Sequence, residues 1–525
     1  MFGKVGICVF IAIVVAATEY SAGKVQPTDD TAALDEYIRT AMRDWGVPGL
    51  AIAVVKDDRA VFAKGYGVRN LATGEPVTAE TVFGIGSVTK SFTATAVAML
   101  VDEHRVSWDA PVKDYVSQFE TYSPYVTSVL SLRDIACHRT GIESANYLQW
   151  RPIERGDNAQ HPTRADIVRA FRYLRPTEEF RTTFAYKNDT WVVAGAVIEA
   201  ASGMTWDQFV HERIFTPLGM KRSSSSVNET DGLRDVAAAH VWAEGKLKAI
   251  PLVNADVPGP MGSINSTALD MSQYIRFHLG NGTFAGRQLL SGPGFAELHQ
   301  PQIIDRGDLT GTPFTKRIAY ALGWWVQDYR GYTLIEHSGA IVGGNSNVAF
   351  LPEKRLGVVV LVNANAQGLV GAISLRVLDA YLGVEPFDWN ARALELKKAN
   401  DARAEAARAE LVKNRVLGTK PSLSLGDYVG IYHNNAYGDL EIKYTDGKLT
   451  VRLWTFTGEL THWNYDTFSL QWDARDYYLH VSPDPATLVR FDLNERGVPS
   501  QVSFLSLGTF VRTDRLVSPP RGARP

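Results

Sequence analysis

The spacing of apolar residues predicts an amphipathic helix followed by strands near the start of the chain. Between Leu34 and Trp45 the apolar residues recur at three- and four-residue intervals, which is typical of a helix with one buried face, and Gly46 ends the pattern. Apolar runs bounded by turn residues predict strands instead. Such runs occur at Leu50–Val55, Arg59–Tyr66, Tyr332–His337, Ser346–Leu351 and Gly357–Asn363.

The long segment between these two groups of strands is mostly helical or loop-like in pattern. Helical spacing is clearest at residues 91–104, 190–201 and 268–279. Strands from two distant parts of a chain, with helices between them, are typical of an antiparallel sheet that helices cover. The pattern therefore predicts an α+β fold, in which helices flank an antiparallel sheet.

The last part of the chain changes from helical to strand periodicity. Residues 389–417 contain no glycine or proline and are rich in Ala, Arg, Glu, Leu and Lys, so they predict a connecting helix, and a charged helix of this kind is usually solvated. Leu440, Ile442 and Tyr444 then alternate with polar residues before the turn sequence Asp446-Gly447. Further short runs at 449–453, 468–472, 477–481, 488–493 and 502–505 predict a small antiparallel barrel or sandwich.

The amino terminus has the layout of a secretory leader. Lys4 precedes an apolar stretch at residues 5–15 that is too short to span a bilayer, and Ala16-Ala17 supplies small residues for cleavage. A secreted or periplasmic protein is expected; the alternatives are an uncleaved anchor or a misassigned start. The predicted units are a leader (1–17), a main domain (18–385), a connecting helix (386–418), a small β domain (419–515) and a tail (516–525).

Composition excludes several classes of partner. The 525 residues carry 54 Lys and Arg against 57 Asp and Glu, so no basic field exists to hold a nucleic acid. Only Cys8 and Cys137 are present, and because Cys8 lies in the predicted leader, we expect no internal disulfide and a buried thiol at Cys137. No metal-ligand motif is recognisable, so neither a metal nor another cofactor is expected.

Ser87 and Lys90 are the first candidates for chemistry. They lie in Gly86-Ser87-Val88-Thr89-Lys90, where a glycine turn enters an apolar helix. Residues three apart share a helix face, so the lysine amine can reach the serine hydroxyl, and the positive helix end can stabilise an oxyanion. Taken alone, this motif favours a helix cap as the role of Ser87.

Two later motifs hold the remaining candidates. Tyr186-Lys187-Asn188 precedes the predicted helix at 190–201, so a phenol and an amide can face one cleft, although a core aromatic and a helix cap are the commoner fates of these residue types. His337-Ser338-Gly339 ends a predicted strand and Ala340 follows it. A lone histidine there is usually structural.

The three motifs in this order resemble the serine β-lactamase and penicillin-binding-protein superfamily, with His-x-Gly as a variant of its Lys-Thr-Gly motif. The resemblance covers about residues 30–385 and includes Pro217-Leu218-Gly219-Met220 and Leu322-Gly323-Trp324-Trp325. It implies a β-lactamase or transpeptidase-like sheet with an all-helical lobe. The terminal domain resembles the lipocalin-like barrel often appended to esterase- and peptidase-like members.

The resemblance also implies roles for individual residues. Ser87 would attack an acyl carbonyl, while Lys90 and Tyr186 share the proton-accepting role, and which of the two takes the proton stays open. The backbone N–H groups of Ser87 and Ala340 would form an oxyanion hole. Asn188, His337 and Gly339 would complete the substrate-binding group.

His337 changes the expected substrate. An imidazole with an ordinary pKa near about 6.5 is mostly neutral at pH 7, so it grips a substrate carboxylate less well than lysine. We therefore expect a serine hydrolase for small acyl substrates, namely esters, short peptides or amides, with weak or no β-lactamase activity. The alternative is a non-catalytic or penicillin-binding protein of the same fold that holds a ligand or peptidoglycan.

Overall fold

The computed structural model describes most of the chain. The described residues are 29–144, 163–305 without 231, 244 and 253, 313–315, 318–473 without 455, 487–504 and 507–513. The predicted leader, the strand expected at 477–481 and the tail at 516–525 lie outside the described residues. Among the helices that are described, none combines the length and the apolar character needed to cross a membrane.

An eight-stranded antiparallel sheet forms the centre of the main domain, in the order β2-β1-β14-β13-β12-β11-β10-β9. Its strands are β1 (Gly49–Lys56), β2 (Arg59–Gly67), β9 (Ile303–Ile304), β10 (Ile318–Tyr320), β11 (Trp325–Tyr329), β12 (Tyr332–Ile341), β13 (Gly344–Leu351) and β14 (Leu356–Val362). The strands that the apolar pattern predicts between residues 50 and 363 all belong to this sheet. β1 and β14, which come from opposite ends of the domain, pair next to the β2 edge of the sheet, with Ile52 opposite Val360.

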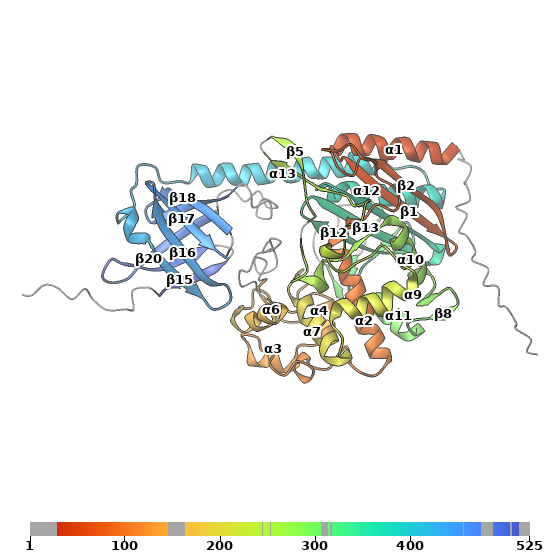
Figure 1. Cartoon of the computed structure of the whole chain (residues 1–525), viewed down its shortest axis with the longest axis horizontal. Helices are drawn as coiled ribbons and strands as arrows, with labels where there is room; N and C mark the ends of the chain where they lie inside the picture. The colour runs from red at the N-terminus through yellow and green to blue at the C-terminus, as the bar shows by residue number, and fades with distance from the viewer. Residues whose placement is uncertain are drawn as a thin grey trace, which may run out of the picture.

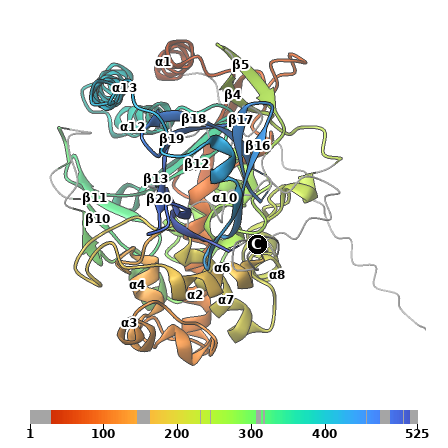
Figure 2. The same cartoon turned by 90° about the vertical axis from the view of Figure 1, so that its left-hand side faces the viewer.

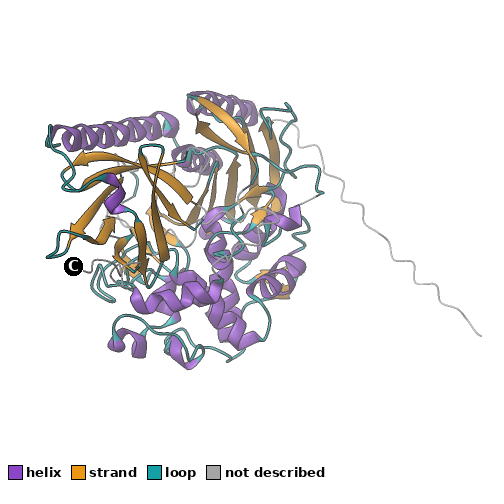
Figure 3. Cartoon of the chain, turned by 60° about the vertical axis from the view of Figure 1, so that its left-hand side comes forward, coloured by secondary structure: helices purple, strands orange, loops and turns teal. Residues whose placement is uncertain are grey.

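Helices cover both faces of the sheet, which explains why β1 and β14 are apolar throughout (Figure 3). The helices are α1 (Asp29–Trp45), α2 (Thr89–Asp102), α3 (Pro124–Val129), α4 (Leu132–Ala136), α6 (Arg164–Ala170), α7 (Thr190–Ser202), α8 (Trp206–Val210), α9 (Thr216–Leu218), α10 (Ala268–Leu279), α11 (Gly292–His299), α12 (Gln367–Leu382) and α13 (Trp389–Lys413). α1 and α12 pack on one face, whereas α10 and the lobe around α2 and α7 pack on the other. The α+β fold class is confirmed.

Three short two-stranded sheets complete the main domain among the described residues. They are β3 (Phe83–Gly84) with β6 (Asn265–Ser266), β4 (Ala239–Ala243) with β5 (Lys246–Ile250), and β7 (Thr283–Phe284) with β8 (Arg287–Gln288). The β3–β6 pair matters most for function, because it holds the chain just before Ser87 and just after Met261 side by side.

The terminal domain is a closed antiparallel barrel, so the barrel prediction is confirmed. Its strands are β15 (Gly430–Asn434), β16 (Gly438–Thr445), β17 (Lys448–Leu453), β18 (Phe456–Asn464), β19 (Thr467–Trp472), β20 (Thr487–Leu493), β21 (Pro499–Phe504) and β22 (Gly508–Arg512). Buried aromatic residues such as Tyr428, Phe468 and Phe491 contact one another in its core. The barrel lies at one end of the molecule and α13 joins it to the main domain (Figures 1 and 2).

The connecting helix α13 differs from the solvated helix that its charge pattern suggests. Its first residue, Trp389, is buried, and the indole Nε1 donates to the carboxylate of Asp379 on α12 at 2.8 Å. Asn390 donates from Nδ2 to Asp44 on α1 at 2.7 Å and accepts from the Trp45 indole at 2.9 Å. The first turn of α13 is therefore part of the main domain, and its later turns are exposed.

Asp379 should be a large contributor to the stability of this junction. Its buried carboxylate accepts hydrogen bonds from Arg330 at 2.7 and 2.9 Å, from Tyr329 at 2.5 Å and from Trp389. We predict that Asp379→Ala lowers the free energy of unfolding by about 3 kcal/mol or more, because these donors lose their buried partner. Glu410→Ala, which removes an exposed pair with Lys413, should cost less than about 1 kcal/mol. Urea denaturation measures both, and equal losses would contradict the prediction.

Candidate active site

Ser87 lies in a tight turn that is pressed against the edge of the sheet. The turn is the 3-10 segment η1 (Gly86–Val88), directly before α2. Gly86 has φ +52°, and a Cβ there would lie 2.6 Å from the carbonyl oxygen of Ala340 on β12. A Cβ on Gly339 would lie 1.9 Å from the carbonyl oxygen of Ile85. Both glycines are therefore required for β12 to approach the serine, and the approach brings Ala340 beside Ser87.

The Lys90 amine lies directly behind the serine. Its Nζ is 2.9 Å from Ser87 Oγ and donates to the carbonyl oxygen of Met261 at 2.8 Å. The side chain is completely buried, and burial lowers the pKa of Lys90 well below its ordinary value, although the nearby carboxylate of Asp189 opposes the shift. A buried amine with a depressed pKa can be neutral near pH 7, so its lone pair is available to accept a proton.

Tyr186 flanks the serine from the loop before α7. Its hydroxyl shares a hydrogen bond with Ser87, and the Lys90 Nζ lies 5.1 Å from the centre of its ring. Burial raises the pKa of Tyr186 above its ordinary value, and the hydrogen bond to Ser87 offsets only part of this shift. This shift favours the protonated form of the phenol.

His138 supports the Tyr186 loop from beneath. Its ring stacks on the Tyr186 ring with a centroid distance of 4.2 Å, and its Nδ1 accepts from the backbone N–H of Lys187 at 3.0 Å. The carbonyl of His138 accepts from the backbone N–H of Ala185 at 2.9 Å. Burial and the neighbouring Lys90 lower the pKa of His138 well below its ordinary value, so the ring is neutral. The structure therefore gives His138 a supporting position beneath Tyr186.

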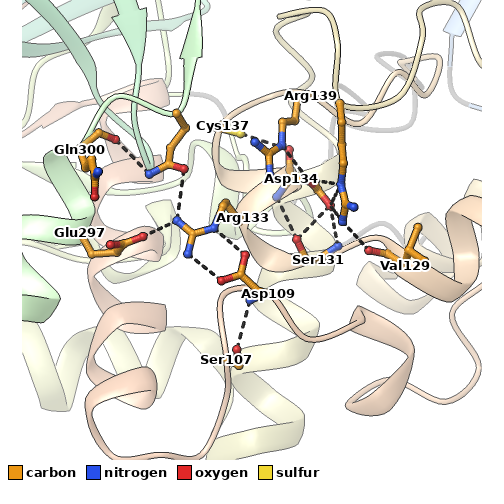
Figure 4. A network of polar contacts seen from close by, with 12 residues as sticks. Ser107, Asp109, Val129, Ser131, Arg133, Asp134, Cys137, Arg139, Glu297 and Gln300 are labelled. Carbon is orange, nitrogen blue, oxygen red and sulfur yellow. Dashed lines mark hydrogen bonds and ion pairs between the residues drawn. The ribbon is translucent and has the colours of Figure 1, made fainter.

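A buried carboxylate ties the same loop to the helical lobe (Figure 4). Asp134 accepts from Arg139 Nε at 2.7 Å and from Arg181 Nη2 at 2.8 Å, and its other partners are the backbone and hydroxyl of Ser131. Arg181 also donates to the carbonyl oxygen of Val129 at 2.8 Å. Because Arg181 lies five residues before Tyr186, this network fixes where the phenol enters the site.

His337 is enclosed between the site and the sheet. Its Nδ1 donates to the carbonyl oxygen of Ser338 at 2.6 Å, so its Nε2 accepts from the Tyr320 hydroxyl at 2.8 Å. Burial and the neighbouring Lys90 lower the pKa of His337 to about 3, which makes the ring neutral at physiological pH. With both nitrogens engaged and 1% of its surface exposed, His337 lies behind the surface that a substrate meets.

A cavity of about 970 Å³ opens in front of these groups. Ser87, Tyr186, Asn188 and Ala340 line it, whereas Lys90, His337 and Gly339 lie behind its wall. The side-chain oxygen of Asn188 is buried without a hydrogen-bond partner among the described residues, which suits a role in holding a polar ligand group. The described residues contain no group of three or more His, Cys, Asp or Glu side chains suited to a metal ion.

Other parts of the site could not be assigned from the motifs. The Met261 carbonyl holds Lys90 through its backbone, so its side-chain identity carries little signal. The cavity is also lined by three residues of α13, namely Trp389, Ala393 and Leu396. Their spacing of four and three residues indicates a helix face that contacts the main domain, but the many charged residues around them favour a solvated helix. Cys137 is buried and free, as expected, and burial raises the pKa of its thiol to about 12.

Comparison with known families shows to which family the chain belongs. The family model described as Beta-lactamase matches residues 34–380. The chain belongs to the β-lactamase family. A second model, described as a domain of unknown function (DUF3471), matches residues 414–512, which include the whole barrel. The superfamily resemblance seen in the three motifs is thereby confirmed, and the family's members include serine hydrolases.

Individual relatives cover much of the chain. Unguisins hydrolase ungD' from Aspergillus campestris is 28% identical over 428 residues, covering 78% of this chain and 77% of that protein. Penicillin-binding protein 4 from Amycolatopsis lactamdurans is 29% identical over 321 residues, covering 60% of this chain and 81% of that protein. The octameric penicillin-binding protein homologue from Pyrococcus abyssi has the same fold, with a TM-score of 0.60, 22% identity, and coverage of 92% of this chain and 100% of that one.

The Asp134 network generates a pH-dependent prediction. Hydrogen bonds and charges from Arg181 and Arg139 hold the pKa of Asp134 below its ordinary value despite burial. Its stabilising effect is therefore complete above the ordinary pKa and is lost as the pH falls through the lower folded value. We predict that Asp134→Asn lowers the free energy of unfolding by about 2 kcal/mol or more at pH 7, and that the difference from the unaltered protein narrows below about pH 4.

Urea denaturation at pH 7 and at pH 3 tests this. The matched control is Glu103→Gln, which weakens a more exposed ion pair with Arg213 and should cost less than about 1 kcal/mol at pH 7. A difference between Asp134→Asn and the unaltered protein that is independent of pH would show that the carboxylate charge is not what stabilises the loop.

Proposed function

We propose that this protein is a serine hydrolase that cleaves esters, short peptides or amides through an acyl-enzyme on Ser87. The observation that carries the proposal is the contact between a buried amine and the serine hydroxyl, at 2.9 Å. The names of the unguisins hydrolases support hydrolysis as the activity. A secreted or periplasmic location is proposed with it, on the leader-like amino terminus alone.

The acylation step follows from the geometry. As Ser87 Oγ bonds to the substrate carbonyl carbon, its proton passes to the neutral Lys90 amine, and the carbonyl electrons move onto oxygen. The backbone N–H groups of Ser87 and Ala340 are the proposed donors to that oxyanion. When the bond to the leaving group breaks, the leaving oxygen or nitrogen takes a proton, and the acyl group stays on Ser87.

Tyr186 is proposed to carry that proton outward. Its phenol stays protonated and shares a hydrogen bond with Ser87, so it can give its proton to the leaving group while Lys90 returns a proton to it. Deacylation repeats the sequence with water in place of Ser87. Water loses its proton to the amine, adds to the acyl carbon, and releases the carboxylic acid and the free serine.

The environment of His337 supports the preference for substrates without a required carboxylate. A neutral ring whose two nitrogens are engaged offers no cation at the position of the family's lysine. Among the described residues that line the cavity, the Lys and Arg side chains are Arg392 and Lys397, and both lie on α13 rather than on β12. Weak β-lactam turnover is therefore part of the proposal.

Active-site labelling tests the proposed nucleophile. A fluorophosphonate probe should label the protein, and Ser87→Ala should abolish labelling and reduce p-nitrophenyl acetate hydrolysis by more than about 10³-fold. Thermal unfolding of the variant should match that of the unaltered protein. Turnover of nitrocefin should be far slower than that of the ester. Absence of labelling in a folded protein would favour the non-catalytic alternative, and stable acylation by penicillin without turnover would favour a penicillin-binding protein.

The pH dependence of kcat/KM identifies the base. Because the amine must be neutral, activity should rise with pH through the depressed pKa of Lys90 and be level well below the ordinary lysine pKa of about 10.4. Tyr186→Phe should lower kcat by about 10- to 100-fold and leave the position of this rise unchanged, whereas Lys90→Ala should remove it. A rise that occurs only above about pH 10 would instead assign the base to a tyrosinate.

A further inference from the structure

The cavity that contains Ser87 is much longer than the site itself. From the serine it passes Ala340, Ile341 and Val342 at the end of β12 and continues between α12 and α13. We propose that this limb, the α12–α13 groove, is a binding subsite for an extended apolar chain of the substrate. The inference rests on the proposed hydrolase function and specifies its substrate class: an ester or amide that carries such a chain on the scissile carbonyl or on its leaving group.

The walls of the groove are predominantly small and apolar. They comprise Trp45 of α1, Gly368, Gly371, Ala372 and Leu375 of α12, and Trp389, Ala393 and Leu396 of α13. A Cβ added to Gly371 would meet no atom within 4 Å, so the space in front of this glycine is empty of protein. Gly368 instead admits the Trp45 ring, which would lie 2.6 Å from an added Cβ. Small residues thus keep the groove open, and two indoles border it.

The charges of α13 do not make the groove a polar site. Arg392 pairs with Glu395 at 2.7 Å, and Lys397 pairs with Asp401 at 2.6 Å, each with a partner on the same helix. These pairs follow the exposed surface of α13, where charged side chains remain solvated. An apolar chain that contacts the indole, leucine and alanine groups between the helices leaves the pairs in water.

Hydrogen bonds hold two of the lining side chains in place. The Trp389 indole donates to Asp379, and the Trp45 indole donates to Asn390, so both indoles have fixed orientations. A preformed apolar cavity binds a chain without first having to order its own walls. The wall supplied by α13 lies between the two segments that match family models, residues 34–380 and 414–512. The subsite therefore requires a part of the chain that neither model describes.

Chain-length selectivity tests the subsite. With p-nitrophenyl esters from acetate to decanoate, kcat/KM of the unaltered protein should rise about fourfold per methylene until the groove is filled. Gly371→Ala, Gly371→Leu and Gly371→Phe place successively larger groups in the groove and should move the best chain length to progressively shorter esters. For Gly371→Phe, the decanoate-to-acetate ratio of kcat/KM should fall at least tenfold.

The matched control is Gly426→Phe, at an exposed glycine of the terminal domain whose Cβ also meets nothing within 4 Å, and it should leave the ratio unchanged. Acetyl esters of alcohols of increasing length form a second series. A rise only in the first series places the chain in the acyl part, and a rise only in the second places it in the leaving group. Ratios that Gly371→Phe does not alter in either series, in a protein with normal thermal unfolding, would overturn the subsite.

A separate measurement distinguishes failure of the subsite from failure of the proposed function. Decanoate should quench or shift the tryptophan fluorescence of Ser87→Ala protein, and Gly371→Phe added to that background should weaken this binding at least tenfold. If no ester is hydrolysed but this binding is observed, the hydrolase proposal fails and the groove stands as an apolar ligand site. If esters are hydrolysed and neither binding nor length selectivity is observed, only the subsite fails.

Discussion

The proposed chemistry depends on one constraint, which is that the Lys90 amine is buried against the Ser87 hydroxyl. An ammonium ion is costly to remove from water, so burial favours the neutral amine, which can accept the serine's proton. The amine donates to the carbonyl oxygen of Met261 and lies within hydrogen-bond distance of Ser87 Oγ. The effect on Tyr186 is the opposite: desolvation raises the pKa of its phenol and favours the protonated form, although 36% of the residue's surface is exposed.

Several segments that are distant in the sequence position the groups around that contact. β12 comes within contact of the serine turn only because Gly86 and Gly339 lack side chains. Two backbone N–H groups of the loop that contains Tyr186 donate hydrogen bonds to His138. The ion pair between Arg181 and Asp134 connects the same loop to the helical lobe. Such contacts position catalytic groups before a substrate binds. Burial and the neighbouring Lys90 keep His337 neutral, so it offers no cation at the position of the family's lysine.

The two ends of the connecting helix α13 lie in different surroundings. Its early residues are fixed by Asp379, Asp44 and Trp45, and they enlarge the cavity beyond the family's own segment. Its later residues are exposed and lead to a barrel whose core is rich in aromatic residues.

The sequence by itself determined the layers of the fold and the motifs of the site, because both are encoded locally. Apolar periodicity marked β1, β14 and α10 almost residue for residue, and Ser87 and Lys90 are neighbours on one helical turn. The short strands β9, β10 and β11 carry too few residues for a period to be recognised, and sheet pairing forms them. Only the tertiary structure decided that Met261 holds Lys90, that His138 supports Tyr186, and that α13 lines the cavity. Protonation was also decided there, since the pKa of Lys90 depends on how much water the other segments exclude.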